Sequence, residues 1–450
     1  MNRLDYLKQH HCKLLFVLIA LPFITMATLH AQGTRLLQQP DISTTHITFT
    51  YGSDIWVSNI NGGEAKRITS TQAVESNPYF SPDGNWIAFS SNRTGYQAVY
   101  VVPAEGGEAK QITWHPSGSL VRGWSNDGKR ILYASNRDTA PSPYNRLWTT
   151  GVADNIPSLV HPQWGFDGAF APDGEHLIID RVSRWDSEWR GYRGGQNTPL
   201  IILNTTTSEE ELLPNESTTD IQPLWLGDVV YFISDRDLVA NIWSFDTKSK
   251  ELQQITEFKG ADVKWLTGND TILAYEREGY LYLIDLNTKT TKQLEIDIIG
   301  DFPWAATKWE DVSSSARAAS LSPNGKRVIV ESRGDIFTIP VEFGDSRNIT
   351  ETSNAADRAP IWSPKGDQLA WFSDIDEKGY ALMLASQDGL DTPTSIAIGE
   401  SKMAWDPSWS PDGKHIAFVD DDVRLRVLNL ETKVIQTIDV GGTNIERGSI

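Results

Sequence analysis

Short runs of apolar residues recur along this chain, each three to five residues long and each bounded by turn-forming residues. Clear examples are residues 86–89, 131–133, 229–233 and 416–419. The runs are rich in β-branched and aromatic residues, which favour strands. Short buried helices are the alternative, but these runs are shorter than typical helices. Because the apolar residues are consecutive rather than alternating, we predict strands that are buried on both faces.

A short turn phrase precedes most of these runs. It reads Ser-Pro-Asp-Gly or a close variant, and its copies end at Gly84, Gly128, Gly174, Gly325, Gly366 and Gly413. In such a phrase proline presets φ, Asp or Asn bonds to the backbone, and glycine adopts a positive φ. Each copy therefore predicts a tight turn between two neighbouring strands.

The spacing of the phrase predicts a repeat architecture. Two degenerate copies lie near Gly227 and Gly268. With these included, the phrase returns at intervals of roughly 40–55 residues, close to the length of a four-stranded propeller blade. Six blades precede residue 297, the rhythm breaks between 297 and 317, and three blades follow. A single nine-bladed ring is the competing geometry.

We therefore predict an all-β chain made of a six-bladed β-propeller followed by an incomplete second β-propeller of about three blades. The expected boundaries are 1–31 for a signal peptide, 36–296 for the first propeller, 297–317 for a connector and 318–450 for the partial second propeller. Three blades cannot close a ring, and an open stack exposes an apolar face and unpaired sheet edges. The chain is thus expected to be a piece of a longer protein.

The N-terminus has the pattern of a secretion signal. Arg3 and Lys8 precede an apolar run at residues 14–21, and Ala31-Gln32 offers a cleavage point. An uncleaved anchor is the alternative, because the apolar stretch is long. The single cysteine, Cys12, lies in the segment to be removed, so no disulfide is expected. We expect a periplasmic or secreted protein with no membrane attachment after cleavage.

Charge and motifs exclude several classes of function. The formal net charge of −19 argues against a nucleic-acid partner, because phosphate binding needs a basic face. The chain has no Gly-x-Ser-x-Gly elbow and no His-Glu-x-x-His, and its eight histidines are scattered. We therefore assign no catalytic residue, no metal site and no cofactor to these 450 residues.

Two motif sets carry a family resemblance. Asn92-Arg93-Thr94-Gly95 and Ser234-Asp235-Arg236, each ahead of a strand, resemble TolB-like propeller repeats. A closer resemblance is to the tricorn protease family. It rests on Leu-Gln-Gln-Pro-Asp-Ile at 37–42, Trp-Arg-Gly-Tyr-Arg-Gly-Gly at 189–195, Leu-Gly-Asp-Val-Val-Tyr-Phe-Ile-Ser-Asp at 226–235, and a new propeller that starts near residue 310.

The tricorn resemblance implies a division of labour. Members of that family have a six-bladed propeller, a seven-bladed propeller, a PDZ domain and a serine-protease domain, and their catalytic residues lie in the last domains. This chain would be the substrate-guiding or assembly portion of a secreted serine peptidase. The implied partners are peptides or unfolded polypeptide and the missing PDZ and protease domains, and a homo-oligomer is compatible with this interpretation.

One insertion is the candidate for substrate guiding or domain docking. Within the fourth blade, residues 184–195 combine arginines and aromatic side chains in a glycine-rich setting. The candidates are Arg184, Trp185, Trp189, Arg190, Tyr192 and Arg193. Arginine binds carboxylates in bidentate fashion and stacks on indole rings. The competing interpretation is an internal Arg–Trp stack that fixes the loop. The resemblance adds Arg122, in a region from which tricorn-like proteins project basic residues.

A non-enzymatic scaffold of the TolB kind is the alternative function. Such a protein would bind protein partners through a propeller face, and would normally carry a small α/β domain before a six-bladed ring. Here the first predicted blade begins within a few residues of the cleavage point, which leaves no room for that domain. A carbohydrate-active propeller has only the abundant tryptophans in its favour, and these are already explained by the cores of the blades.

The signal is directly testable. When the full chain is exported by a Gram-negative host, the mature protein should begin at Gln32, because signal peptidase cleaves after small residues. N-terminal sequencing of the soluble periplasmic fraction measures this. Retention of Met1 on membrane-bound protein would contradict cleavage and favour the anchor.

Overall fold

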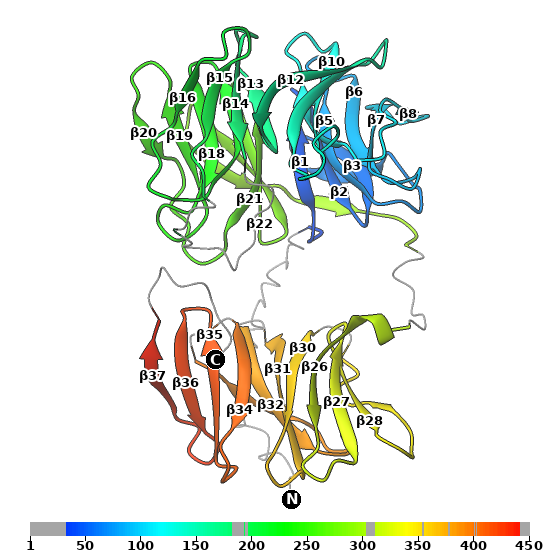
Figure 1. Ribbon diagram of the computed structural model, residues 1–450, viewed down its shortest axis with the longest axis vertical. Coiled ribbons are helices and arrows are strands. Elements are labelled where there is room, and N and C mark those ends of the chain that lie inside the picture. The colour runs from blue at the N-terminus through cyan, green and yellow to red at the C-terminus, as the bar shows by residue number, and fades with distance from the viewer. Residues whose placement is uncertain are drawn as a thin grey trace, which may run out of the picture.

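The computed structural model describes residues 33–441 except 182–192, 194–196, 303–310, 353–354, 377–378, 400 and 402. Within these residues it contains 37 strands and one 3-10 turn at Ser313–Ser315. The strands form nine separate sheets, each built on an antiparallel meander of four strands. Figure 1 shows the sheets in two groups along the chain. The predicted all-β fold is confirmed.

Six sheets form the first group, here called the first propeller. Its first three sheets contain β1 Gln38–Ile42, β2 His46–Tyr51, β3 Asp54–Asn59, β4 Gly63–Arg67, β5 Glu75–Phe80, β6 Trp86–Ser91, β7 Ala98–Pro103, β8 Lys110–Gln111, β9 Leu120–Trp124, β10 Arg130–Ser135, β11 Arg146–Gly151 and β12 Pro157–Trp164. The next three contain β13 Asp167–Phe170, β14 His176–Asp180, β15 Ile201–Asn204, β16 Glu210–Leu212, β17 Asp220–Leu226, β18 Val229–Ser234, β19 Asn241–Asp246, β20 Leu252–Gln254, β21 Val263–Gly268, β22 Ile272–Arg277, β23 Tyr280–Asp285 and β24 Thr291–Gln293.

The turn phrase forms the tight hairpin turn that its residue types predict. Between β5 and β6, Gly84 has a φ of +72° and its N–H donates to the Ser81 carbonyl at 2.7 Å. The Ser81 hydroxyl donates to the Asp83 carboxylate at 2.5 Å and accepts from the Trp86 N–H at 3.0 Å. The phrase therefore closes the hairpin through both backbone and side-chain bonds.

The innermost strand of most sheets carries a bulge that the sequence analysis did not predict. Its central residue lies in the left-handed region, with φ values of 53° at Gln39, 55° at Asn77, 50° at Gln222 and 50° at Trp265. The strand register shifts at each of these points. Three of the four are followed by proline, which lacks an N–H and is tolerated in sheets only at edges and bulges.

The N–H of the bulge residue is satisfied by the preceding blade. The Gln39 N–H donates to Glu276 Oε2 at 3.3 Å, and the Asn77 N–H donates to Gln39 Oε1 at 2.7 Å. The Gln222 N–H donates to Asp180 Oδ2 at 3.3 Å. These bonds connect neighbouring sheets around the inner wall of the first propeller.

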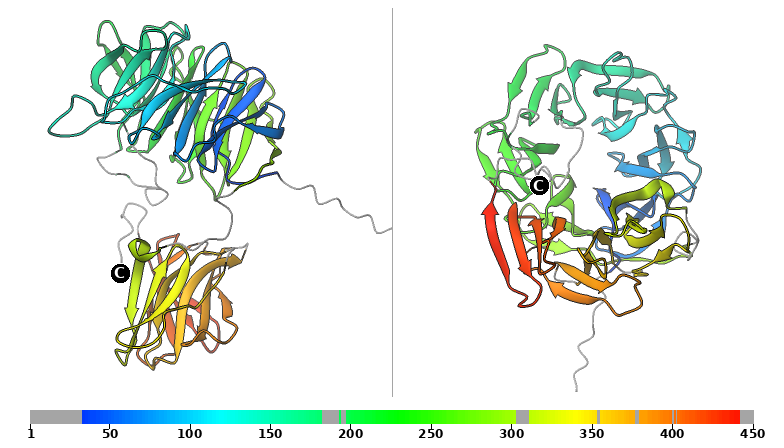
Figure 2. Two further views of the ribbon diagram at one scale, coloured as in Figure 1. Left: turned by 90° about the vertical axis from the view of Figure 1, so that its right-hand side faces the viewer. Right: turned by 60° about the horizontal axis from the view of Figure 1, so that its bottom comes forward.

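The six sheets close into a ring, so the nine-bladed alternative is wrong (Figure 2). One core contains Leu37, Phe49 and Trp56 of the first sheet together with Ala274 and Leu281 of the sixth. An additional strand, β25 Ile296–Ile298, then pairs in parallel with β4 at the outer edge of the first sheet. The predicted connector therefore begins as a strand, because Ile296 and Ile298 still pack on this core.

Asp41 on β1 ties the closing sheets together. Its carboxylate accepts the Phe80 N–H of β5 at 2.7 Å and the Thr267 hydroxyl of β21. These partners lie on the two sheets that flank β1. Burial raises the pKa of Asp41 from its ordinary value of 3.8 to about 7, although both hydrogen bonds act to lower it.

Three sheets form the second group. They contain β26 Ala316–Leu321, β27 Arg327–Ser332, β28 Asp335–Pro340, β29 Arg347–Asn348, β30 Asp357–Trp362, β31 Gln368–Asp376, β32 Gly379–Ser386, β33 Thr394–Ala397, β34 Ala404–Trp409, β35 His415–Asp420, β36 Arg424–Asn429 and β37 Ile435–Val440. One core joins the first of these sheets to the second, and another joins the second to the third. No core cluster of the described residues joins the third to the first, and the group is an open arc (Figure 2).

The part of the chain that the structure describes contains no helix with the length and apolar character needed to cross a bilayer.

The closing core can be tested with two isoleucines that lie three residues apart. Ile296 is fully buried in this core, whereas Ile299 is 66% exposed. Ile296→Ala should lower the free energy of unfolding by about 2–5 kcal/mol, because it deletes buried methyl groups and leaves a cavity. Ile299→Ala should change it by less than about 0.5 kcal/mol. Urea titration followed by tryptophan fluorescence measures both, and equal effects would contradict the assignment of β25 to the ring.

The buried Asp41 predicts a pH dependence. Between about pH 4 and pH 7 the native state keeps the Asp41 proton and the unfolded chain has lost it. The free energy of unfolding should therefore fall as the pH rises through this range. Asp41→Asn mimics the protonated carboxyl at every pH, so its urea midpoint should fall less than that of the parent between these two pH values. Parallel pH profiles for the two proteins would contradict the raised pKa.

Candidate functional site

The candidate site is a small cavity on the axis of the first propeller, with a volume of about 50 Å³. The inner strands of five of the six sheets contribute to its wall. The lining residues are Tyr79, Arg122, Asp167, Gly168, Ala169, Gln222, Pro223, Leu224, Trp265, Leu266 and Thr267. Because ligand sites are concave pockets held in place by a rigid scaffold, this cavity is the candidate binding site.

Two aromatic rings meet at this cavity from sheets that are not neighbours. The ring centroids of Tyr79 on β5 and Trp265 on β21 are 6.2 Å apart, with an interplanar angle of 41°. The sheet of β1 lies between their sheets in the ring. Trp265 is itself a left-handed bulge residue, so the local backbone distortion of β21 brings a large side chain to the axis.

Arg122 and Asp167 form a buried ion pair on another part of the wall. Arg122 Nη1 lies 3.6 Å from Asp167 Oδ2, and both residues are 6% exposed. The Arg122 Nε–H also donates to the Phe166 carbonyl at 3.0 Å, and the guanidinium lies 4.1 Å from the centre of the Phe166 ring. The guanidinium therefore contacts the Asp167 carboxylate, the Phe166 carbonyl and the Phe166 ring. These contacts connect β9 to the first residue of β13 and the residue before it.

Burial controls the protonation of the acids and phenol at this site. It raises the pKa of Asp167, while the nearby Arg122 charge and the Gly168 N–H lower it. Burial raises the pKa of Tyr79 well above its usual value of 10, with a smaller contribution from Asp167. Tyr79 therefore presents a neutral hydroxyl at physiological pH.

Two polar atoms at the cavity are buried and have no hydrogen-bond partner among the described residues. They are Gln222 Oε1, an acceptor, and Trp265 Nε1, a donor. A cavity of this size and polarity has room for a few water molecules or for one small polar solute.

The predicted insertion is connected to the propeller through Arg193. Arg193 Nη1 lies 3.1 Å from Asp235 Oδ2, and its Nη2 donates to the Asp235 carbonyl at 2.9 Å. Asp235 is fully buried and also accepts the Thr219 N–H at 2.9 Å. Arg193 is therefore engaged inside the protein, which favours the internal-anchor interpretation for this residue. The other predicted members lie outside the described residues: Arg184, Trp185, Trp189, Arg190 and Tyr192.

Arg122 also differs from its predicted position. It was expected to project as a basic guide, but it is buried and paired with Asp167. Its place on the axial wall keeps it at the candidate site. Its role in guiding a substrate stays a prediction.

The TolB-like motifs have structural roles in the blades. Arg93 pairs with the buried Glu75 and lies 4.5 Å from the centre of the Tyr100 ring. Arg236 pairs with the buried Asp220 at 2.7 Å in the same way. Each of these arginines connects the first strand of its sheet to the loop after the second strand. The TolB-like motif therefore stabilises the blade and does not indicate a binding site.

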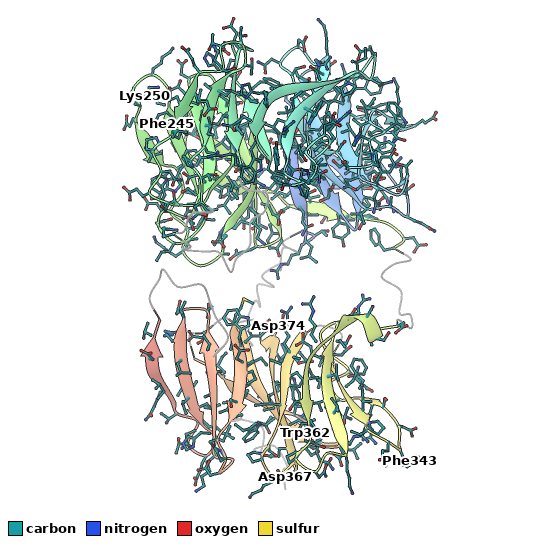
Figure 3. All side chains as sticks on the ribbon, viewed as in Figure 1. Phe245, Lys250, Phe343, Trp362, Asp367 and Asp374 are labelled. Carbon is teal, nitrogen blue, oxygen red and sulfur yellow. The ribbon has the colours of Figure 1, made fainter. Side chains whose placement is uncertain are left out.

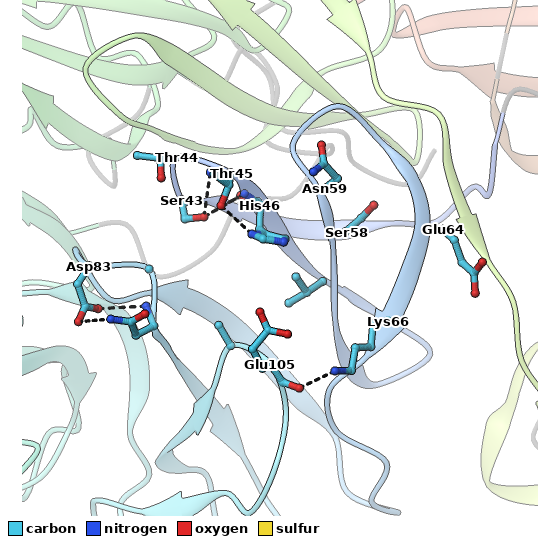
Figure 4. A pocket seen from close by; sticks show the side chains of 14 residues that line it. Ser43, Thr44, Thr45, His46, Ser58, Asn59, Glu64, Lys66, Asp83 and Glu105 are labelled. Carbon is cyan, nitrogen blue, oxygen red and sulfur yellow. Dashed lines mark hydrogen bonds between the residues drawn. The ribbon is translucent and has the colours of Figure 1, made fainter.

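A second hollow of about 360 Å³ lies at the surface between the first two sheets (Figure 4). It is lined mainly by hydroxyl, amide and charged side chains. Lys66 Nζ donates to the Glu105 carbonyl at 2.6 Å, and the Thr45 hydroxyl lies 2.8 Å from His46 Nδ1. No Phe, Tyr or Trp is among the residues that line this hollow. Across the described residues, no group of three or more His, Cys, Asp or Glu side chains is arranged to hold a metal ion.

Sequence reasoning missed most of the axial residues. Tyr79, Asp167, Gln222 and Trp265 carry no motif of their own. The available signal was the recurrence of a polar residue followed by proline at the start of the blades, as in Gln39-Pro40, Asn77-Pro78 and Gln222-Pro223. A proline at this place marks a bulged inner strand, and one of the residues before these prolines, Gln222, lines the cavity.

Comparison with known proteins agrees with this architecture. Residues 34–290 match the family model described as the tricorn protease N-terminal beta propeller domain. Tricorn protease homolog 1 of Streptomyces coelicolor is 27% identical over 412 residues, which cover 87% of this chain and 37% of that protein. A protein of Sulfurisphaera tokodaii, named as the C-terminal subunit of a tricorn-like protease, is 24% identical over 48% of this chain and 24% of its own length.

A solved structure supports the fold. The crystal structure of the tricorn protease superposes with a TM-score of 0.55 at 23% identity, and the match covers 90% of this chain and 39% of that one. The chain therefore spans little more than a third of the length of these full-length proteins. Since the family model covers more than half of the chain, the protein belongs to the tricorn protease family and carries that family's N-terminal β-propeller domain.

Proposed function

We propose that this chain is the propeller portion of a secreted tricorn-type serine peptidase, which binds or guides peptides and organises assembly while other domains cleave them. The observation that carries the proposal is the family match to the first propeller, combined with a second group of sheets that is open at both ends. The described residues form blades and the loops that connect them.

The first sheet of the second group has an apolar face without a neighbouring blade. Two rows of cross-strand neighbours run over this face. They are Leu321, Val328 and Ile339 in one row, and Ala319, Val330 and Phe337 in the other. Leu321 is 59% exposed, whereas Ile329, on the opposite face, is fully buried against the next sheet. Phe343, beside this sheet, is 90% exposed (Figure 3).

The last sheet of the group presents a similar face at the other end. Trp405, Val419 and Leu425 are cross-strand neighbours and are half-buried, and Ala417 and Val427 continue the face. Contiguous apolar faces of this kind mark surfaces that another element covers. Sheet faces inside the first propeller are covered by the next blade, so further blades are the occupants that best fit both ends of the arc.

Further blades and a protease domain are thus the proposed partners. This proposal is supported by the relative from Sulfurisphaera tokodaii, whose name, as the C-terminal subunit of a tricorn-like protease, describes a separate subunit. We propose that here the further blades and the protease domain complete the second ring, either from the same polypeptide or from a subunit, and that peptides are the substrate of the whole assembly. We also propose export to the periplasm, which is supported by the signal-like residues 1–31.

Peptide cleavage and active-site labelling test the division of labour. The 450-residue protein should neither cleave a fluorogenic peptide nor react with a serine-directed fluorophosphonate, because the proposed nucleophile lies outside it. A longer protein translated from the continuing reading frame, or the complex with a separate subunit, should do both. Cleavage or labelling by the 450-residue protein alone would contradict the proposal, as would an inactive longer protein whose second ring is complete.

A further inference from the structure

We propose that Asn61 is a site of spontaneous deamidation, and that its isoaspartate product releases β25 from the outer edge of the first sheet. The chain contains two Asn-Gly pairs, Asn61-Gly62 and Asn324-Gly325. Glycine has no side chain to hinder attack by its backbone nitrogen on the preceding asparagine, so both pairs have the sequence that favours this reaction. Their surroundings in the fold are different.

The reaction needs water and no other reagent. The Gly62 nitrogen attacks Cγ of Asn61, a C–N bond forms, and the side-chain nitrogen leaves as ammonia with the proton of the Gly62 N–H. Water then adds to one carbonyl of the cyclic imide and breaks one of its two C–N bonds. Breaking the bond at Cγ gives aspartate. Breaking the bond at the backbone carbonyl carbon gives isoaspartate, in which the main chain runs through Cβ and Cγ.

The first observation is that the two asparagine side chains are held differently, although both residues are exposed. Asn324 Oδ1 accepts the Ser322 hydroxyl at 2.9 Å and the Lys326 N–H at 3.1 Å. Among the described residues the Asn61 side chain has no hydrogen-bond partner, and only its backbone N–H and carbonyl are bonded. The Asn61 amide is therefore free to rotate toward the Gly62 nitrogen, whereas Asn324 must first break two bonds.

The attacking nitrogens are held alike in the two turns. The Gly62 N–H donates to the Asn59 carbonyl at 2.9 Å, and the Gly325 N–H donates to the Ser322 carbonyl at 2.8 Å. Both glycines have a positive φ, of 94° at Gly62 and 71° at Gly325. Each attack must break one comparable backbone hydrogen bond, so the hold on the asparagine side chain is what separates the two rates.

The second observation is the close packing of Gly62 on the residue that precedes β25. A Cβ atom at Gly62 would lie 2.5 Å from the Glu295 carbonyl oxygen, so the two backbones are in direct contact. The Gly63 N–H donates to the same oxygen at 2.7 Å. Isoaspartate adds one atom to the main chain between residues 61 and 62, and the contact with Glu295 leaves no space for it.

The modification therefore acts on the strand by which the chain leaves the first propeller. β25 pairs with β4 over three residues only, beginning with Ile296 opposite Gly63. A shift of Gly62 and Gly63 breaks this register and draws Ile296 out of the core that joins the first and sixth sheets. The aspartate product carries the same new charge but keeps the main chain unchanged, so it leaves β25 in place.

Peptide mapping by mass spectrometry tests the modification site. In the folded 450-residue protein at mildly alkaline pH, Asn61 should deamidate about tenfold faster than Asn324, because two hydrogen bonds must break before Asn324 reacts. In urea the two rates should agree within about threefold, since both asparagines precede glycine and neither turn persists. Ser322→Ala should raise the rate at Asn324 and leave the rate at Asn61 unchanged.

Hydrogen exchange and urea titration test the release of β25. Aged protein, with isoaspartate at residue 61 quantified by isoaspartyl methyltransferase, should have a lower urea midpoint and faster exchange at Gly63 than fresh protein. Asn61→Asp supplies the charge without the extra main-chain atom, and Asn61→Gln resists cyclisation because its side chain is longer. Both variants should keep the midpoint and the Gly63 protection of the fresh parent.

Two results would overturn the proposal. One is deamidation of Asn61 that is no faster than that of Asn324 in the folded protein, which contradicts the modification site. The other is an isoaspartate-bearing protein with the urea midpoint and Gly63 protection of the fresh protein, which contradicts the effect on β25. Neither measurement involves peptide cleavage, so this proposal and the proposed function fail separately.

Discussion

The structure depends on one requirement, which is that a backbone N–H turned away from its own sheet must find an acceptor on the neighbouring blade. Left-handed residues at the bulges of the inner strands create this requirement, and Gln39, Asn77 and Gln222 meet it with acceptors on the preceding sheet. A buried donor without a partner costs about 1–3 kcal/mol. These hydrogen bonds therefore stabilise each blade beside its neighbour, which favours a closed ring.

The same requirement explains the difference between the two groups of sheets. In the first propeller, β1 meets the sixth sheet through a shared core, and Asp41 bonds to both flanking sheets. In the second group, the bulge residue Ala359 donates its N–H to Glu331 of the preceding sheet at 2.9 Å. The corresponding residue Ala318 on β26 is exposed, and no sheet precedes β26 in the described part of this group. The second group is thus built by the same rule but is open at its ends.

Much of the fold could be predicted because its signals are local. The turn phrase ending at Gly84 requires a positive φ, and consecutive apolar residues such as 229–233 require burial on both faces, so blades follow from short stretches of sequence. The strand β25 could not be predicted in this way, since Ile296–Ile298 is short and its partner β4 lies more than two hundred residues earlier. The axial site was missed for a related reason. Tyr79 and Trp265 are in contact only because the six sheets close into a ring. The local sequence of neither strand predicts this contact.

Two arginines show what the sequence pattern leaves open. Arg122 and Arg193 were predicted as substrate-guiding or domain-docking residues, and in the structure each is engaged with an internal acid, Asp167 or Asp235. In a chain with a net charge of −19, acceptors for arginine are abundant, and other arginines pair with buried acids within a single blade, such as Arg93 with Glu75 and Arg236 with Asp220. Within the described residues, the first ring is closed and the second group of sheets is open.

Hydrogen exchange followed by mass spectrometry on the 450-residue protein tests this account most directly, because β1 and β26 are the first inner strands of their groups. The account predicts strong protection of the β1 amides, which exchange only when the sealed ring opens, and much weaker protection of the β26 amides beside an uncovered face. Equal protection of β1 and β26 would contradict the claim that the second group is unsealed.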